Sequence, residues 1–416
     1  MMGMKARQYL PILIATAVAA PGIVMRLAGI HFDPPLMTLV SGMAVLGASF
    51  LLLWACDVVQ TDISQTLALA VVALIAVLPE YAVDMYFTWE AGQFPDSAYA
   101  GYAVANMTGA NRLLIGVAWA AVAVLYWLRH RKIVHLAAVR RTEMVFLAMA
   151  TVYAFVVCLK GSLAWYDGLV FLGLYVWYMR IGGGRPVEEC EVEGPAELLA
   201  RMPKVRRRLA TAVMFLFAAG AILANAEPFC EGLIGTGKVL GINEFVLVQW
   251  LAPIASEAPE FTVALMFALR GQPGLALGSL LSSKLNQWTL LVGMIPGVFA
   301  VSHGSLDHPL PMGQFQMDEI LLTAAQSLLG VVMLASLRLS LRGAFLLFAL
   351  FSGQLLAPVI VAALPGGMFF GLSPAQMHPL FSVLYFVAAG ALLVRRPKNV
   401  IHLWHGLRKD VPRQEA

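Results

Sequence analysis

The sequence has few charged residues and few cysteines, and both shortages limit the class of protein. Asp, Glu, Lys and Arg make up 12% of its 416 residues, which is about half the fraction typical of soluble domains. The cysteines are Cys56, Cys158, Cys190 and Cys230. They are too far apart in sequence for a paired metal or redox motif, and we interpret them as packing residues. Hydrophobic residues make up 60% of the chain, and this composition predicts a membrane protein.

Common enzyme motifs are also absent. The sequence has no His-Glu-x-x-His, no phosphate-binding Gly-Lys-Ser/Thr loop and no Cys-x-x-Cys. The net charge of +4 comes from basic residues in short loops between apolar runs, so it does not indicate a nucleic-acid partner. We therefore expect no enzyme activity and no cofactor other than a transported cation. The expected partners are the lipid bilayer and small inorganic cations, and the oligomeric state is left open.

Long apolar runs recur from one end of the chain to the other and predict an all-α polytopic membrane protein with about 12 spans. The runs cover residues 9–30, 36–57, 63–90, 98–128, 143–160, 163–180, 207–230, 240–269, 274–302, 318–338, 343–364 and 379–395. The longest of them exceed the ~20 residues that a helix needs to cross the hydrocarbon, so we expect these helices to tilt or break. The small residues around Ala20 resemble a signal-peptidase site, but the apolar run continues past them, and we expect a retained helix.

The basic residues predict the orientation of these spans. With the N-terminus in the cytoplasm, all but five of the 28 Lys and Arg residues fall on the cytoplasmic side, as the positive-inside rule requires. The five exceptions are Arg26, Arg112, Lys160, Lys238 and Lys284. We therefore expect an integral protein of a bacterial-type inner (plasma) membrane, with both termini cytoplasmic.

Two segments 180 residues apart resemble each other and indicate an internal repeat. Pro79-Glu80 and Pro259-Glu260 each lie within a long apolar run, and each is followed by another long run rich in small and amide residues. Five spans per repeat place the copies in opposite orientations, which is the inverted-repeat plan of secondary transporters. We divide the chain into an extra N-terminal helix (1–35), a first repeat (36–180), a cytoplasmic linker (181–206), an inverted second repeat (207–364) and an extra C-terminal helix with a basic tail (365–416).

This pattern resembles the calcium/cation antiporter superfamily, the group of the sodium/calcium and calcium/proton exchangers. In that family Gly-Thr-Ser precedes Leu-Pro-Glu, and Gly-Asn-x-x-Gly-Ser-Asn follows. Leu78-Pro79-Glu80 and Ala258-Pro259-Glu260 match the two cores, and Ser256 precedes the second. The downstream motifs are matched in part, by Asn106, Gly109 and Asn111 in the first repeat and by Gly278 and Ser283 in the second.

The chain also departs from the family pattern, which marks it as a divergent member. Ile75-Ala76-Val77 replaces the first Gly-Thr-Ser, and Glu257 stands where the second repeat has Ser. Ser279 and Lys284 replace downstream asparagines, and Asp84 is an added carboxylate. These changes leave the fold inference intact and leave the transported ion open.

A buried carboxylate at mid-membrane costs about 2.5–3.5 kcal/mol on insertion scales, so a cation, a proton or a base must compensate for it. Asp84 lies one turn from Glu80, and Glu257 lies three residues before Glu260, so each pair shares a helix face. We expect Glu80 and Glu260 to be the principal metal ligands. Further oxygens would come from the remaining candidate ligands Asn106, Asn111, Asp84, Ser256, Glu257 and Ser279.

Prolines and buried bases complete the expected site. Pro79 and Pro259 lack an amide hydrogen, so we expect each to break its helix and free a carbonyl near its Glu. Lys284 and Arg112 are expected to compensate charge or to couple transport, Lys284 near Glu257 or Glu260 and Arg112 near Asp84 or Glu80. A structural ion pair of these bases with Asp84 and Glu257 is the alternative, as is simple interhelical bonding by the two asparagines.

Together these features predict a secondary-active antiporter that exchanges calcium for sodium or protons by alternating access at a mid-membrane carboxylate site. Two alternatives stay open. One is a monovalent cation (sodium or potassium)/proton antiporter on the same fold, and the other is a non-transporting membrane protein with paired buried charges.

Overall fold

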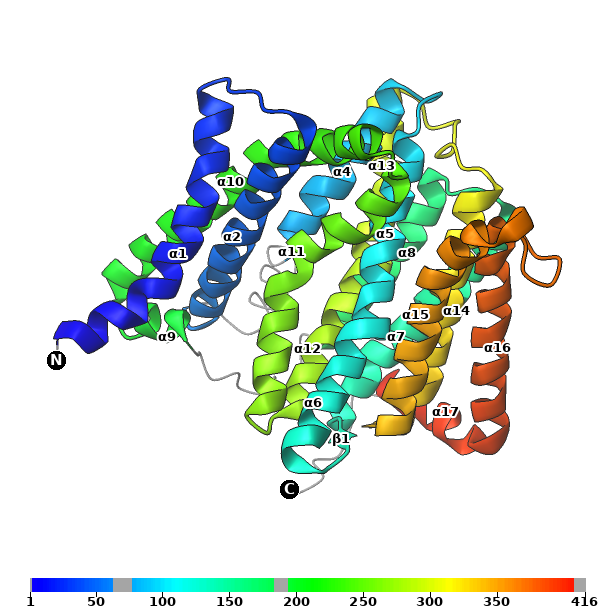
Figure 1. Cartoon of the computed structure of the whole chain (residues 1–416). Helices are drawn as coiled ribbons and strands as arrows, with labels where there is room; N and C mark the ends of the chain where they lie inside the picture. Colours follow the sequence, from blue (N-terminus) through cyan, green and yellow to red (C-terminus); the bar gives the residue numbers. More distant parts are fainter. Residues whose placement is uncertain (1, 63–76, 183–193, 408–416) are drawn as a thin grey trace. The chain divides into compact units, whose positions relative to one another are not determined.

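The computed structural model describes residues 2–62, 77–182 and 194–407, and these residues are almost entirely helical (Figure 1). The first half contains α1 Met2–Leu27, α2 Pro34–Gln60, α4 Leu78–Gln93, α5 Tyr99–Leu113, the π-helix η1 Leu114–Trp119, α6 Ala120–His130, η2 Ala138–Arg140, α7 Arg141–Lys160, α8 Trp165–Gly182 and α9 Pro195–Ala200. The second half contains α10 Lys204–Leu240, α11 Glu244–Leu269, α12 Pro273–Asn286, the π-helix η3 Gln287–Leu291, α13 Val292–His303, α14 Gln314–Leu334, α15 Leu341–Ala363, η4 Pro365–Gly367, η5 Pro374–Gln376, α16 Met377–Arg395, α17 Pro397–Leu403 and η6 Trp404–Leu407.

Nine helical stretches among the described residues are long and apolar enough to cross a membrane, which confirms an all-helical membrane protein. They are Tyr9–Leu27, Pro34–Gln60, Tyr99–His130, Ala138–Lys160, Lys204–Leu240, Pro273–His303, Gln314–Leu334, Leu341–Ala363 and Pro374–Arg395. The spans expected at 63–90, 163–180 and 240–269 are not among the nine. Residues 63–76 of the first lie outside the described part, while α8 and α11 occupy most of the other two.

Residue contacts divide the chain into two compact units, and each unit takes segments from both halves of the sequence. Unit 1 is Met1–Trp89 with Gly182–Glu260, and unit 2 is Glu90–Ile181 with Phe261–Ala416. The boundaries between the units fall inside α4 and α11 as well as at the end of α8. These are the two helices that carry the repeated Pro-Glu pairs.

In unit 1, α2 packs along α10, and α1 covers both helices (Figure 1). Small residues bring the three backbones close together. A methyl group added at Gly22 of α1 would lie 2.5 Å from the Cβ of Ala44 on α2 and 2.3 Å from Oδ1 of Asn225 on α10. Thr38 and Thr236 then hydrogen-bond through their hydroxyls at 2.8 Å between α2 and α10. This combination of small residues and polar contacts is typical of helix packing in lipid.

In unit 2, α14 packs against α5, α7 and α16, and α15 packs against α6, η1 and α16. Two short contacts tie the loops at the ends of these helices together. Strand β1 (Val134–His135) pairs antiparallel with β2 (Arg338–Leu339), and an isolated bridge joins Leu163 to Leu310. Each contact places two loops at the same end of the unit.

Large apolar side chains remain exposed along the faces that point away from the protein interior. On α10, Leu209, Val213, Leu216 and Leu223 form a helical stripe, and each side chain is at least 58% exposed. A stripe of this kind is unfavourable in water, but it is the expected surface of a helix that faces lipid acyl chains.

Candidate functional site

The four carboxylates that the sequence analysis proposed as ligands all lie within unit 1, two on α4 and two on α11. Glu80 and Asp84 are one turn apart on α4, and Glu257 and Glu260 are three residues apart on α11. Glu80, Asp84 and Glu257 are each no more than 4% exposed, and Glu260 is half-buried. Neighbouring acids at these helical spacings share a face, so unit 1 presents a concentrated acidic site.

Glu80 lies at the centre of this acidic cluster. Both of its carboxylate oxygens are buried and accept no hydrogen bond from the described residues. Among its charged neighbours, the carboxyl group of Glu257 repels it most, and Asp84 and Glu260 also lie near enough to repel it. Carboxylates packed this closely cannot all stay ionised unless a proton or a cation lies among them. The cluster is therefore built to hold one or the other.

The expected helix breaks at the prolines of the two Pro-Glu pairs can be compared with the structure. Helix α11 runs without interruption through Pro253 and Pro259, so the break expected at Pro259 is not observed. Pro79 is the second residue of α4, and most of the segment before it lies outside the described residues. Pro259 still has no amide hydrogen, so the carbonyl one turn before it loses its usual helical donor.

The remaining predicted ligands behave in two ways. Ser256 belongs to unit 1, where its buried hydroxyl donates to the carbonyl of Ala252 at 3.2 Å. Asn106, Asn111 and Ser279 belong to unit 2. The two asparagines are fully buried, whereas Ser279 is exposed and donates to the carbonyl of Ala276 at 2.9 Å. The structure thus gathers the acids within unit 1, and a single site that includes the unit 2 ligands stays a prediction.

Lys284 and Asn111 contact each other within unit 2. The Lys284 ammonium donates to Oδ1 of Asn111 at 2.7 Å and to the Asn111 backbone carbonyl at 3.4 Å. The ammonium also lies 4.5 Å from the centre of the Trp288 ring, in a cation–π contact. Asn111 uses its own amide nitrogen to donate to the carbonyl of Met107 at 2.8 Å. Lys284 and Asn111, which the predicted repeats would align, are therefore direct partners.

A π-helical turn follows each of these two residues at the same spacing. The segment η1 begins at Leu114, three residues after Asn111, and η3 begins at Gln287, three residues after Lys284. Short π-helical turns inside α-helices are rare overall, and those that occur are often found at functional sites. The turns were not predicted from the sequence, because nothing in the local apolar pattern separates a π-turn from an α-helix.

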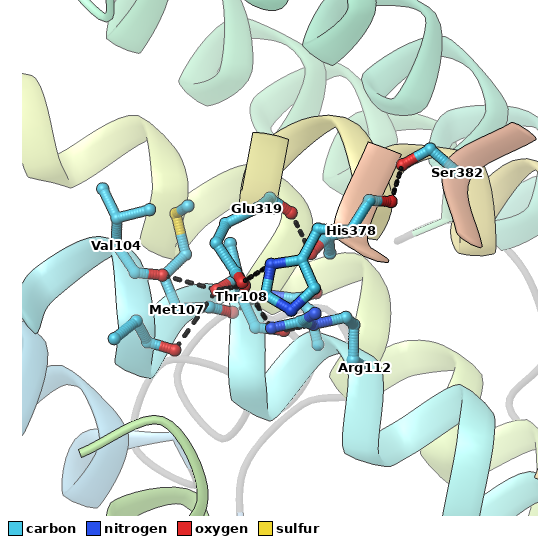
Figure 2. Close-up of polar contacts among 10 residues, drawn as sticks. Val104, Met107, Thr108, Arg112, Glu319, His378 and Ser382 are labelled. Atoms are coloured by element: carbon cyan, nitrogen blue, oxygen red, sulfur yellow. Dashed lines mark hydrogen bonds and ion pairs between the residues drawn. The ribbon is translucent and has the colours of Figure 1, made fainter. Parts of the chain in front are cut away.

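Arg112 pairs with Glu319 of α14, a residue that the sequence analysis did not single out (Figure 2). The other Glu319 oxygen lies 2.7 Å from Nδ1 of His378 on α16. Arg112 and Glu319 are fully buried, whereas 13% of the His378 side chain is exposed. Two adjacent acids, Asp318 and Glu319, at the start of the apolar run 318–338 were the signal that would have revealed Glu319.

Comparison with known proteins identifies this arrangement. The family model described as sodium/calcium exchanger protein matches residues 34–181 and 210–360. The chain belongs to the sodium/calcium exchanger family. The protein is thus a membrane-embedded cation/calcium antiporter rather than an enzyme.

Similar proteins within and near the family differ in how much of the chain they cover. The crystal structure of an H+/Ca2+ exchanger, CAX, is 40% identical, covers 96% of this chain and 98% of its own, and superposes with a TM-score of 0.89. A putative antiporter, CaxA, of Alkalimonas amylolytica is 23% identical over 65% of this chain and 85% of its own. The sodium-calcium exchanger NCX_Mj, 18% identical with a TM-score of 0.50, covers 80% of this chain and 99% of its own, and it shares the fold.

Proposed function

We propose that the protein exchanges calcium for protons, with the acidic cluster of α4 and α11 as the binding site. The observation that carries this proposal is the packing of the Glu80 carboxyl group against Glu257, with Asp84 and Glu260 close by. Such a cluster is neutralised either by a divalent cation or by protons. Calcium binding would displace protons from the acids, and the two species would then compete for one site.

The similarity to CAX, described as an H+/Ca2+ exchanger, supports the proton as the counter-ion. It extends over 96% of this chain at 40% identity. The fold of NCX_Mj is shared at only 18% identity and does not bear on the counter-ion. Sodium as the counter-ion is therefore the second outcome that an experiment must distinguish.

Lys284 provides a further reason to favour protons over sodium. Its ammonium is fully buried and donates a hydrogen bond to the side-chain oxygen of Asn111. The resemblance to other exchangers would make this oxygen a cation ligand. A fixed ammonium supplies a permanent positive charge in the place of a bound sodium ion. We propose that Lys284 thereby leaves the site with room for one calcium ion or about two protons, and less for additional sodium.

Two observations support the proposed pair of inverted five-helix repeats with one extra helix at each end. The family model matches the chain in two separate segments, 34–181 and 210–360. The two π-helical turns also begin three residues after the aligned residues Asn111 and Lys284. Transporters with this symmetry alternate access by moving one group of helices against the other, and the same movement is proposed here.

Contacts between loops support the proposed orientation, in which both termini are cytoplasmic. The pairing of β1 with β2 joins the loops after α6 and α14, both of which were assigned to the cytoplasmic side. The Leu163–Leu310 bridge joins two loops that were assigned to the outer side. Asp62, just after α2, pairs with Arg207 near the start of α10, again at two ends assigned to the cytoplasm.

Calcium uptake by the purified protein in liposomes tests the proposal. We expect uptake under an imposed pH gradient and none under a sodium gradient of the same size, and we expect Glu260→Gln to abolish it. Uptake driven only by a sodium gradient would show that the counter-ion is sodium rather than the proton. No calcium flux under either gradient would overturn the proposal.

A further inference from the structure

Glu319 joins two basic side chains inside unit 2, and none of the three was proposed as a cation ligand. One of its oxygens accepts a hydrogen bond from Arg112, and the other lies 2.7 Å from Nδ1 of His378. Figure 2 shows Glu319 between these two residues. The three side chains come from three different helices, Arg112 from α5, Glu319 from α14 and His378 from α16. A carboxylate with one base on each oxygen is the centre of a charge network.

The three side chains differ in their access to the surface. Arg112 and Glu319 are no more than 1% exposed, whereas His378 is 13% exposed and is the second residue of α16. His378 therefore connects a buried ion pair to the end of a membrane-spanning helix. In the proposed orientation this is the outer end, which faces the side opposite the cytoplasm.

Counting charge at this cluster singles out His378 as the group that changes state. An ionised Arg112 and an ionised Glu319 balance each other, and arginine does not lose its proton in proteins. His378 Nδ1 lies 2.7 Å from the second Glu319 oxygen, and the two form an ion pair only when the ring is protonated. A second proton on the ring converts that contact into a charge-assisted hydrogen bond and adds one positive charge to the cluster.

We propose that Glu319 and His378 form a proton-binding site that controls the rate of transport. The site is made of residues other than the proposed cation ligands. Its ligand is a proton from the side of the membrane on which α16 begins. The control of transport rests on the proposed antiport function, whereas proton binding at His378 does not.

The groups around His378 leave the imidazole as the titrating member of this site. On α14, Asp318 accepts a hydrogen bond from Gln314 at 2.9 Å, and the Phe315 ring lies 5.6 Å from the imidazole. Of the other helices that pack against α16, α15 carries Arg342 and α17 carries Lys398. Arg342 is the second residue of α15, and Lys398 follows the C-terminal end of α16, whereas His378 is at the N-terminal end of α16.

The network reaches helix α5 at a position that matters for the proposed site. Arg112 follows Asn111, the partner of Lys284, and the Arg112 backbone carbonyl accepts a hydrogen bond from Gln326 of α14 at 3.3 Å. The Thr108 hydroxyl lies 3.5 Å from Glu319 one turn earlier on α5. A change of charge at His378 therefore acts on the contact between α14 and the stretch of α5 that holds Asn111.

Two measurements on the full-length protein test this proposal. The first is an NMR titration of protein carrying carbon-13 histidine in detergent, with His378→Asn to assign the His378 signal. Asparagine keeps a donor near the Nδ1 position but does not titrate. We expect the His378 signal to respond to pH, and we expect Glu319→Gln to alter that response. A signal that does not titrate, or that is unaffected by Glu319→Gln, would overturn the proton site.

The second measurement is calcium equilibrium exchange across liposomes at equal pH on both sides, which removes the driving force of a pH gradient. We expect the wild-type rate to change about threefold or more between about pH 6 and 8. The dependence should flatten in His378→Asn and persist in His31→Asn, an exposed histidine assigned to the same side. An unchanged profile in His378→Asn would refute control by this site. Loss of exchange in all proteins would instead contradict the antiport function, with the NMR result still valid.

Discussion

Lys284 donates a hydrogen bond to the side-chain oxygen of Asn111 at 2.7 Å, and the proposed repeats align these two residues. Each precedes a π-helical turn by three residues. In the proposed function, an amide that would bind a cation is thus paired with an ammonium. This contact is the basis of the proposal that protons rather than sodium are the counter-ion.

Replacing Lys284 by asparagine restores the amide that the family pattern has at this position, and it removes the fixed charge. We expect Lys284→Asn to alter ion dependence, so that sodium gradients begin to drive calcium uptake. Proton-driven uptake should fall about tenfold, which corresponds to about 1.4 kcal/mol in the barrier. Lys284→Arg keeps the charge and should retain proton dependence at a reduced rate. Unchanged ion dependence in Lys284→Asn would contradict the role given to the ammonium.

Neutralising Glu80 tests the acidic cluster separately from transport. Glu80→Gln removes one charge from the group that includes Glu257 and Asp84, so calcium affinity should fall by about two orders of magnitude or more, as a lost charged ligand costs several kcal/mol. Isothermal titration calorimetry of the purified protein measures this change. Glu197→Gln is the matched control, because Glu197 is an exposed acid paired with Arg201 on a short helix. Equal calcium affinity in both variants would exclude Glu80 as a ligand.

Gly116 lies where η1 meets α15, and a methyl group there would come within 2.5 Å of the Phe351 side chain. Gly116→Ala should destabilise the protein by about 1–3 kcal/mol through overpacking, which thermal unfolding in detergent detects. Gly173→Ala on α8 is the control, since an added methyl group there meets nothing within 4 Å. That variant should be neutral or slightly stabilising. Equal stability of the two variants would show that the contact with Phe351 is not tight.

Asp62 accepts two hydrogen bonds from the Arg207 guanidinium, at 2.6 and 3.0 Å. Arg207 holds the pKa of this carboxyl below its ordinary value, mainly through the hydrogen bonds between them. A carboxyl with a lowered folded-state pKa adds stability above its unfolded pKa of about 3.9, and this stability is lost as the pH falls through the folded value. Asp62→Asn should therefore lower the unfolding temperature at neutral pH and have no effect in strong acid. A penalty that is the same at both pH values would contradict this account.

The sequence contained enough information for the class of protein, the family and the acidic residues. Low charge and long apolar runs predict helices in a membrane, and the repeated Pro-Glu pairs locate Glu80 and Glu260 through the unusual cost of placing acids there. These features are local, because each is visible within one apolar segment. Within each pair the acids are close together for the same reason, since both lie on one face of a single helix, whereas the contact of Glu80 with Glu257 joins two helices that are distant in sequence.

The pairing of distant residues was not accessible in the same way. Arg112 and Glu319 are 207 residues apart, and no periodic pattern connects them. The division into two units that each combine both halves of the chain depends on helix packing rather than on sequence order. Proline propensity predicts a helix break at Pro259, but α11 continues through it. Neighbouring helices can stabilise a proline-containing membrane helix that would break in isolation.

The most direct test of the central claim is calcium-dependent proton movement across liposomes that contain the purified protein and a trapped pH indicator. Addition of calcium outside, without sodium, should drive protons out, and Glu80→Gln and Glu260→Gln should abolish the signal. Calcium entry without any proton movement, in the same vesicles, would contradict exchange of the two ions at one acidic site.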